Sequence, residues 1–440
     1  MKMRRILAIL LVLMLAASSL AGCNQAGEQN NTLNVAAIET SYGTESWKAV
    51  CEAFEKANEG VTVNLTINKQ LEDSIGPNMK AGDYPDVVHL AVGREAALTE
   101  TMIKENGLLD LTDVLGMTNP GESKTVKEKI LPSFIETSIT NPYSDGKTYL
   151  APMFYGPCGL FYNAGLFEEK GWKVPETWDE MWELGEKAKA EGIALFTYPT
   201  TGYFDAFFYA LLYEAGGDEF FKKATQYSEG IWDTAEAQKV FDIIAKLASY
   251  TEKSTPSNAT DTTYLKNQTL ICENKALFMP NGNWVIGEMK DVPKADNFEW
   301  GFTALPAMEA GGDRYSYTFF EQCWIPKEAK NPELAKKFVA FLYSDEAIKI
   351  FAESETPAVQ PVQGVADTLT DENMKLYYSI YDNGAKAAVG AFATTDPVEG
   401  VDVRSVWFDP INSLVSGDKT QQEWVDGIKQ ASDTLRGALK

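Results

Sequence analysis

The sequence predicts an α/β protein of two lobes, because two separate regions alternate strand and helix patterns. The first region runs from residue 33 to residue 90 in the order strand, helix, strand, helix, strand, and the second begins near residue 150. This alternation is typical of α/β domains with a parallel sheet. The chain has 440 residues, 45% of them hydrophobic, and ten are tryptophan. Such a chain is long and apolar enough for more than one buried core.

The first region combines three apolar strands with an amphipathic helix. A strand is expected over 33–38, followed by a loop over 39–45. The next helix carries apolar side chains at the i, i+3, i+4, i+7 spacing of a single face, namely Trp47, Val50, Cys51 and Phe54. Residues 61–67 alternate apolar and polar side chains, which predicts a half-buried strand. Residues 85–90 predict a short buried strand.

The second region begins with a strand over 153–162 and continues with a capped helix. Thr177 and Glu180 have the spacing of a capping box, in which the Thr hydroxyl and the Glu side chain satisfy free amides at the helix start. A further strand is expected over 193–196. It is followed by an amphipathic helix that Thr234 is able to cap.

The C-terminal third adds one more strand and two helices. The strand is expected over 300–305, and the Gly-Gly turn at 311–312 allows the chain to cross back. A helix begins at Pro332, because proline at the first helical position loses no hydrogen bond that the helix needs. The last helix has its apolar face within 424–435. The Ala- and Gly-rich segment 384–393 is either tightly packed or mobile.

Residues 1–22 are predicted to form a cleaved secretory signal. The start is basic, residues 6–15 are apolar without a charge, and small residues precede Cys23. The apolar run is shorter than the roughly 20 residues that a membrane-spanning helix needs. Leu-Ala-Gly-Cys at 20–23 resembles the bacterial lipobox, whose cysteine is acylated; an ordinary signal with a chance cysteine is the alternative. Residues 23–32 then form a lipidated cysteine and a flexible tether, which holds the protein at the extracellular face of the cell membrane.

Composition narrows the partners and the chemistry. The formal net charge is −24 at pH 7, which disfavours nucleic acid as a partner because nucleic acid requires basic patches. After Cys23 four scattered cysteines remain, namely Cys51, Cys158, Cys272 and Cys323. They allow two disulfides, one or none, and we favour four buried apolar side chains. His89 is the only histidine, so we expect no metal site, no cofactor and no histidine-activated nucleophile.

Several stretches occur in an order that is similar to one large protein family. They are Gly-Asp-Tyr-Pro-Asp-Val-Val at 82–88, Leu-Phe-Tyr-Asn at 160–163 with Leu-Phe-Glu at 166–168, Pro-Glu-Thr-Trp-Asp-Glu at 175–180, Ala-Leu-Phe-Met at 276–279 with Gly-Asn-Trp at 282–284, and Ile-Pro-Lys at 325–327 before Asn-Pro at 331–332. Nearly the whole mature chain thereby resembles the extracellular solute-binding proteins of ATP-driven sugar importers, the family 1 group that is maltose-binding-protein-like.

The resemblance implies a two-lobed, periplasmic-binding-protein-like α/β fold with the ligand cleft between the lobes and multiple crossovers. The crossovers would fall near 150–155, 307–315 and 358–365. Lobe 1 would comprise 33–150 plus 315–360, and lobe 2 would comprise 151–314 plus 361–440. A cleft between domains is a common ligand site, and closure around a ligand is a hinge motion.

The resemblance also implies which aromatic side chains stack on a sugar. Tyr203, Phe204, Trp284 and Trp407 match positions whose aromatic rings contact sugar in the maltose-binding group. A pyranose ring offers apolar faces to aromatic rings and hydroxyls to polar side chains at its edge. For each of these residues the alternative is a core or rim aromatic.

The polar part of the cleft departs from the maltose-binding pattern, because Gly93 and Gly156 stand where that group has acidic residues. Maltose is therefore not assumed as the ligand. The candidate replacements are Tyr42, Glu45, His89, Arg94, Tyr155 and Glu321. Arg94 and Glu321 are alternatively members of ion pairs. For His89 we favour a structural role.

By this resemblance the chain captures a mono- or oligosaccharide and delivers it to ABC permease subunits. It would act as a monomer without enzymatic activity, with an amino sugar such as N-acetylglucosamine or a chitobiose-like disaccharide as one candidate ligand. One alternative is a secreted glycoside hydrolase, which needs two carboxylates roughly 5 to 10 Å apart. Another is the same fold binding a peptide, a polyamine or an iron complex. No catalytic motif stands out, which favours the binding protein.

Overall fold

The computed structural model describes residues 31–40, 43–94, 96–135 and 137–439. The predicted signal, Cys23, most of the tether and Tyr42 lie outside these residues. Within them the strands form one sheet, made of β1 (Thr32–Ile38), β2 (Thr62–Asn68), β3 (Val87–His89), β4 (Ala151–Asn163), β5 (Ala194–Phe196), β6 (Ala276–Gly282), β7 (Trp300–Thr303), β8 (Tyr315–Trp324) and β9 (Lys386–Ala388). The strand order is β2-β1-β3-β8-β4-β6-β5, with β7 also paired to β4 and β9 to β8.

The sheet is mixed, which corrects the expectation of parallel strands in both regions. Strands β1, β2 and β3 are parallel, as predicted for lobe 1. Strands β4 and β8 are antiparallel to each other, because the chain leaves lobe 1 along β4 and returns along β8. Strands β6 and β7 also pair antiparallel with β4, whereas β5–β6 and β8–β9 are parallel pairs.

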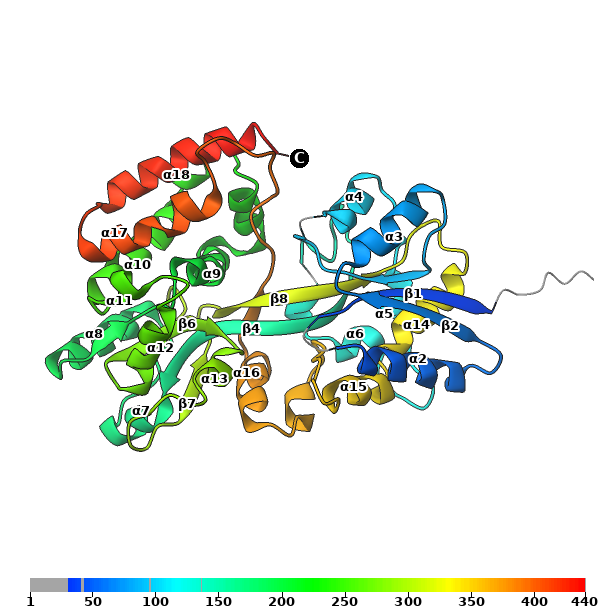
Figure 1. The fold of residues 1–440 in the computed structure, drawn as a ribbon, viewed down its shortest axis with the longest axis horizontal. Helices are drawn as coiled ribbons and strands as arrows, with labels where there is room; N and C mark the ends of the chain where they lie inside the picture. Colours follow the sequence, from blue (N-terminus) through cyan, green and yellow to red (C-terminus); the bar gives the residue numbers. More distant parts are fainter. Residues whose placement is uncertain (1–30, 41–42, 95, 136, 440) are drawn as a thin grey trace, which may run out of the picture.

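Two lobes lie side by side, and the long strands β4 and β8 run across both (Figure 1). Around the strands of lobe 1 lie α2 (Glu45–Ala57), α3 (Leu71–Lys80), α4 (Leu98–Lys104), α5 (Thr112–Leu115), α6 (Val126–Lys129), α14 (Pro332–Phe341) and α15 (Asp345–Ala352). Lobe 2 contains α7 (Ala164–Lys170), α8 (Trp178–Ala190), α9 (Phe204–Thr225), α10 (Ala235–Tyr250), α11 (Thr255–Asn258), α12 (Tyr264–Cys272), α13 (Val285–Glu288), α17 (Pro410–Ser416) and α18 (Gln421–Arg436). Helix α16 (Glu372–Asp382) lies near the junction. Of the helices in the described ranges, none is both long and apolar enough to cross a membrane.

The crossing strands are shared between the lobes. Tyr317, near the start of β8, belongs to an apolar cluster within lobe 2. Ile325, just after β8, belongs to a cluster that fills much of lobe 1 and continues into lobe 2 at Ile271 and Met279. The lobe 1 core also continues into residues of α16 such as Tyr377. We propose lobes close to the predicted boundaries, except that β4 and β8 are common to both lobes and that α16 packs into the cluster that fills lobe 1.

The two threonine caps form as predicted, but the Glu180 half of the predicted capping box does not, because Glu180 binds the amide of Glu176 instead of that of Thr177. The Thr234 hydroxyl accepts a hydrogen bond from the Ala237 amide at 3.3 Å and caps α10. The Thr177 hydroxyl accepts from the Glu180 amide at 3.2 Å, and the Glu180 carboxylate accepts from the Glu176 amide at 2.7 Å. Each threonine bond satisfies a backbone donor that the helix itself leaves free, and the Glu180 bond fixes the residue before the cap.

Buried small and apolar residues account for two features that the sequence left open. Cys51, Cys158, Cys272 and Cys323 are all buried and unpaired, which matches their interpretation as core side chains. The segment 384–393 is packed rather than mobile, because it contains β9 and its residues Ala388 and Val389 are buried.

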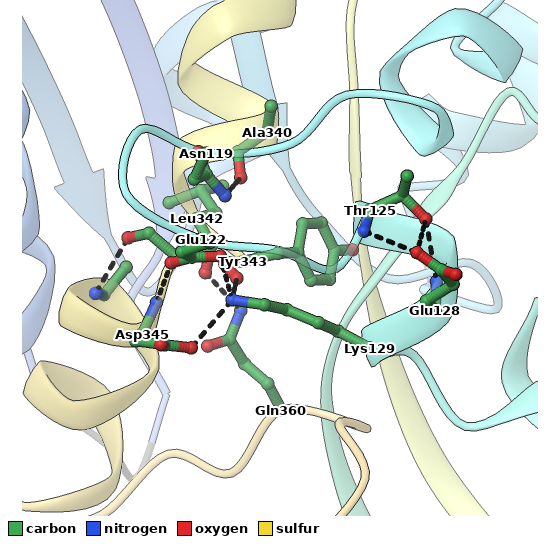
Figure 2. A network of polar contacts seen from close by, with 12 residues as sticks. Asn119, Glu122, Thr125, Glu128, Lys129, Ala340, Leu342, Tyr343, Asp345 and Gln360 are labelled. Carbon is green, nitrogen blue, oxygen red and sulfur yellow. Dashed lines mark hydrogen bonds and ion pairs between the residues drawn. The ribbon is translucent and has the colours of Figure 1, made fainter.

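A polar network around Lys129 joins separate segments of lobe 1 (Figure 2). The Lys129 ammonium contacts the Glu122 carboxylate and lies 2.8 Å from Oδ1 of Asp345. It also donates to the Tyr343 carbonyl oxygen at 2.9 Å. Only 8% of the Lys129 side chain and 11% of the Glu122 side chain are exposed. Because a nearly buried charge needs its partner, this network fixes the segment around α6 to the start of α15.

Lys129→Met is expected to lower the free energy of unfolding by about 2–3 kcal/mol, because the nearly buried Glu122 carboxylate loses its counter-charge. Urea unfolding measures the loss. The matched control is Lys223→Met, which removes an exposed pair with Glu219 and should change stability by less than about 1 kcal/mol. Equal effects of the two variants would contradict the role assigned to the network.

Candidate functional site

A cavity of about 300 Å³ opens in lobe 2 beside the crossing strands. Its walls come from η2 (Thr201–Tyr203), the start of α9, the middle of β4 and β8, the end of β6, and the one-turn helix η5 (Arg404–Phe408). The side chains that define its chemistry are Tyr203, Asp205, Asn281, Trp284, Phe319 and Arg404. The size is at the small end of the range for ligand sites, and the mixture of aromatic and polar groups is typical of them.

Three aromatic rings form one wall, with Trp284 in the middle. The Trp284 ring centroid lies 6.1 Å from that of Tyr203 and 5.8 Å from that of Phe319. The indole nitrogen of Trp284 donates to the Tyr203 hydroxyl at 3.3 Å, which orients the ring. Large apolar side chains that stay exposed in the described part of the chain are Leu265, Trp284, Phe319 and Leu439. Two of these four therefore line this one cavity.

The turn that carries Trp284 depends on a glycine. An added Cβ at Gly282 would lie 2.1 Å from the Trp284 ring, so only glycine lets the ring fold over this position. The preceding Asn281 is fixed on both sides of its amide. Its nitrogen donates to the Gln268 side chain at 2.6 Å, and its oxygen accepts from the Gly282 amide at 2.9 Å. Asn281 is thus held rigidly at the cavity wall.

Asp205, in the first turn of α9, places a carboxyl group at the cavity. Burial raises the pKa of Asp205 to about 6, while the hydrogen bond from the Ala206 amide and the charge of Arg404 act in the opposite direction. One carboxyl oxygen accepts that amide hydrogen bond. A half-buried carboxyl group with a raised pKa in a cavity, with acceptor capacity left over, is a feature of functional sites.

Asp205→Asn is expected to stabilise the protein at pH 7.5, by at most about 3 kcal/mol. Because the pKa is raised on folding, the neutral acid favours the folded state, and that contribution is lost as the pH rises from the ordinary pKa of 3.8 through about 6. Urea unfolding of both proteins at pH 4 and pH 7.5 measures the difference. The prediction fails if wild type and variant lose the same stability between the two pH values.

The Arg404 side chain lines the cavity, and polar contacts with its neighbours hold it there. The Thr201 hydroxyl donates to Oδ1 of Asp409 at 2.6 Å, and Nε of Arg404 lies 3.5 Å from the same oxygen. The guanidinium carbon is 3.8 Å from where a Gly202 Cβ would be, so Arg404 covers this backbone. Helix η5 is a π-helix, in which Arg404 lines the cavity while Trp407 is buried. Single π-helical turns occur frequently at functional sites.

The structure brings two of the four predicted stacking residues together. Tyr203 and Trp284 both line the cavity. Phe204 is 2% exposed and packs against Tyr198 and other rings of the lobe 2 core. The Phe204 ring therefore points into the core of lobe 2, while the neighbouring Tyr203 faces the cavity.

Trp407 is completely buried. Its ring packs 5.1 Å from Phe392 and 5.9 Å from Trp232, centroid to centroid. Protein groups therefore cover the ring, and Phe204 and Trp407 both adopt the alternative core role. The proposed site does not include them.

The predicted polar contacts are scattered rather than gathered. Glu45 is exposed and pairs with Lys48 at 2.7 Å on the surface of α2. Arg94 forms a bidentate ion pair with Glu72 of α3, which is the ion-pair role that the sequence offered as the alternative to ligand binding. Tyr155 is buried in the core, with its ring 4.9 Å from that of Tyr378. Tyr42 lies outside the described residues.

Glu321 and His89 form a pair at the junction of the lobes. The Nε2 atom of His89 lies 3.0 Å from Oε2 of Glu321. His89 is fully buried at the end of β3, with its ring 4.9 Å from that of Trp47 and 5.2 Å from that of Phe154. The structural role favoured for His89 agrees with this placement. Glu321 keeps 18% of its side chain exposed.

Sequence reasoning missed Asp205, Asn281, Phe319 and Arg404 as cavity residues. Each lies within three residues of a predicted position, so the predicted segments reach the cavity, but partly with other side chains than those predicted. A carboxylate directly after an aromatic pair was the available signal for Asp205. The direction of each side chain depends on the local helix type and on strand register, which the sequence pattern leaves undetermined.

The fold and the cavity together define a class of protein. Two α/β lobes joined by long crossing strands, with an aromatic cavity beside those strands, have the architecture of two-lobed solute-binding proteins. A family model described as bacterial extracellular solute-binding protein matches residues 40–349. The chain belongs to this family, which confirms the resemblance and the two-lobed fold expected from the sequence.

Relatives and solved structures agree with this assignment over most of the chain. The diacetylchitobiose binding protein NgcE of Streptomyces coelicolor is 23% identical over 423 residues, which cover 92% of this chain and 85% of that protein. The galactooligosaccharide-binding protein of Bacillus subtilis is 22% identical over 458 residues, covering 100% and 99% of the two chains. The structure of the bacterial solute receptor AcbH superposes with a TM-score of 0.73 at 18% identity, covering 92% of this chain and 100% of that chain. The structural likeness shows a shared fold.

Proposed function

We propose that this solute-binding protein captures a carbohydrate in the lobe 2 cavity and delivers it, as a monomer, to the permease subunits of an ABC importer. The observation that carries the proposal is the exposure of Trp284 (36%) and Phe319 (49%) beside the half-buried Asp205 carboxyl group. Exposed aromatic faces attract the apolar faces of a sugar ring, while a carboxylate accepts hydrogen bonds from its hydroxyls. Asn281 and Arg404 supply further polar groups at the same wall.

The names of the relatives support a sugar as the ligand and suggest which sugar to test first. NgcE is named for diacetylchitobiose, the Bacillus subtilis relative for galactooligosaccharides, and AcbH for a preference for β-D-galactopyranose. An amino-sugar disaccharide is therefore the first ligand to test. A useful receptor would bind it with a dissociation constant of about 1 μM, which corresponds to roughly 8 kcal/mol.

A melting-temperature panel tests the proposal. The panel contains N,N′-diacetylchitobiose, maltose, raffinose and D-galactose, with spermidine and a short peptide for the alternative of a non-sugar solute. A sugar present at 100 times its dissociation constant should stabilise the folded protein by about 2.7 kcal/mol. If only spermidine or the peptide raised the melting temperature, or if nothing did, the carbohydrate proposal would be abandoned.

The same samples test the enzymatic alternative. A binding protein returns its sugar unchanged, so we expect no release of reducing ends from N,N′-diacetylchitobiose or raffinose on long incubation. Detectable, enzyme-dependent hydrolysis would instead support a glycoside hydrolase, which places two carboxylates across the scissile bond.

We also propose that Cys23 anchors the protein to the outside of the cell membrane by acyl chains, on the basis of the lipobox-like 20–23 segment. Cys23→Ala is expected to move the protein from the membrane fraction to the medium or the periplasm, because the anchor is lost. Fractionation and immunoblotting measure the change, and purified variant and wild type should bind the same sugar equally. Retention of the variant in the membrane fraction would contradict the anchor.

A further inference from the structure

An open strip of sheet surface leads away from the aromatic cavity along β8. Successive residues of a strand point to opposite faces, so Phe319 and Glu321 lie on the same face. Tyr155 and Phe320, which are directly opposite each other, are buried on the other face. Two strand residues span about 6.6 Å. Glu321 therefore stands one step from the Phe319 ring, in the direction of lobe 1.

The strip is open because β4 contributes a glycine to it. Gly156 is directly opposite Phe319 in the β4–β8 register, and opposed residues point to the same face. An added Cβ at Gly156 would meet no described atom within 4 Å beyond its chain neighbours. Gly159 differs, because a Cβ there would lie 2.6 Å from the Thr303 carbonyl oxygen. Close packing explains why residue 159 is a glycine. Packing does not explain why residue 156 is one, because a side chain would fit there.

The Glu321 carboxylate lies at the far end of the strip and contacts the buried His89 side chain. Its Oε2 atom is buried and faces Nε2 of His89 at 3.0 Å. His89 is held by the Trp47 and Phe154 rings and lies at the carboxyl end of β3, where parallel strands commonly present ligand contacts. Neither Oε2 of Glu321 nor Nε2 of His89 has a hydrogen-bond partner within the described residues, so the contact is an ion-pair distance. Because Oε2 is buried against His89, Oε1 is the carboxylate oxygen left to a ligand.

We propose that this strip is a second sugar subsite, so that the ligand is at least a disaccharide. One ring occupies the cavity against Trp284, and the next ring lies over Gly156 with a hydroxyl donating to Glu321. His89 is a positioning residue, which acts on the sugar only through the Glu321 carboxylate. The absence of a side chain at Gly156 provides the space, and the spacing from Phe319 to Glu321 suits one further ring. This inference rests on the proposed carbohydrate function.

Gly156→Val tests the subsite directly, because a β-branched side chain suits a strand and has room here. The probes are matched pairs: N,N′-diacetylchitobiose with N-acetylglucosamine, maltose with glucose, and raffinose with D-galactose. Wild type should bind the larger sugar of at least one pair about tenfold or more tightly than the smaller. Gly156→Val should remove that difference, with monosaccharide affinity unchanged. The sugar-free melting temperature should stay the same.

The control is Gly427→Val in α18, another site where an added Cβ meets no described atom. It should retain the preference for the larger sugar. Retention of the preference by Gly156→Val, or equal affinity of wild type for both members of every pair, would overturn the second subsite. If wild type bound no sugar at all, the proposed function itself would fail, and the subsite with it. Isothermal titration calorimetry distinguishes these results.

The role of His89 is tested by a double-mutant cycle with Glu321. His89→Gln and Glu321→Gln should each weaken binding of the larger sugar, and the double variant should be no weaker than Glu321→Gln alone. Neither change should alter monosaccharide affinity. Additive losses, or an equal loss for the monosaccharide, would show that His89 acts on the fold rather than through Glu321. Gly156→Val leaves the buried His89 cluster intact, so the subsite remains testable if His89→Gln does not fold.

Discussion

Trp284→Ala is expected to weaken sugar binding about 10- to 100-fold, because it removes the middle ring of the aromatic wall. Trp284 contacts Tyr203 on one side and Phe319 on the other, so no neighbouring ring can take its place. The ring is 36% exposed, and its loss should change the free energy of unfolding by less than about 1 kcal/mol. Isothermal titration calorimetry with the best sugar of the melting panel measures the loss of affinity.

Leu265→Ala is a suitable control for Trp284→Ala. Leu265 is also an exposed apolar residue of lobe 2, but it does not line the cavity. The control should leave the sugar affinity within about twofold of wild type. Unchanged affinity in Trp284→Ala would mean that the sugar does not stack on this wall.

Trp407→Ala should lower stability and leave sugar affinity nearly unchanged, which is the reverse of the result expected for Trp284→Ala. Truncation of a fully buried tryptophan is expected to lower the free energy of unfolding by about 3–5 kcal/mol, because a large cavity remains in the lobe 2 core. Trp407 is 0% exposed and surrounded by Phe392, Trp232 and Tyr227. Sugar affinity of the fraction that stays folded should change little. Urea unfolding at 25 °C measures stability, and calorimetry below the unfolding transition measures affinity.

A comparison of the two tryptophan variants therefore distinguishes a residue of the sugar site from a residue of the core. Trp407→Phe is the matched control, and it should lose less stability than Trp407→Ala because it leaves a smaller cavity. If Trp407→Ala kept full stability and lost sugar binding, the ring would contact the ligand as in the maltose-binding group. The placement of Trp407 in the core would then be wrong for the sugar-bound protein.

The sequence was sufficient for the fold because its signals are local and repeated. The apolar spacing in α2, the Thr caps of α8 and α10, and the Asn-Pro start of α14 each coincide with an element of the structure. What the sequence could not supply was the direction of β4 and β8. That direction depends on the path of the chain between the lobes, and the apolar pattern of a buried strand is the same in either direction.

The site was predicted less completely, and the reason is geometric. Tyr203 and Trp284 were identified, but Phe204 and Trp407 were chosen instead of their neighbours Asp205 and Arg404. A shift of one to three positions along a helical turn exchanges a cavity side chain for a core side chain. At η5 the π-helical turn changes that relation further, and no sequence pattern indicated it.

A crystal structure of the protein with the sugar that raises its melting temperature most tests the central proposal most directly. We predict one sugar ring with its apolar face on Trp284 and Phe319, and a hydroxyl within hydrogen-bonding distance of the Asp205 carboxylate. The lobes are expected to close around it by a hinge motion. A sugar bound away from this cavity, with Trp284 and Asp205 free of contact, would contradict the proposed function of the site.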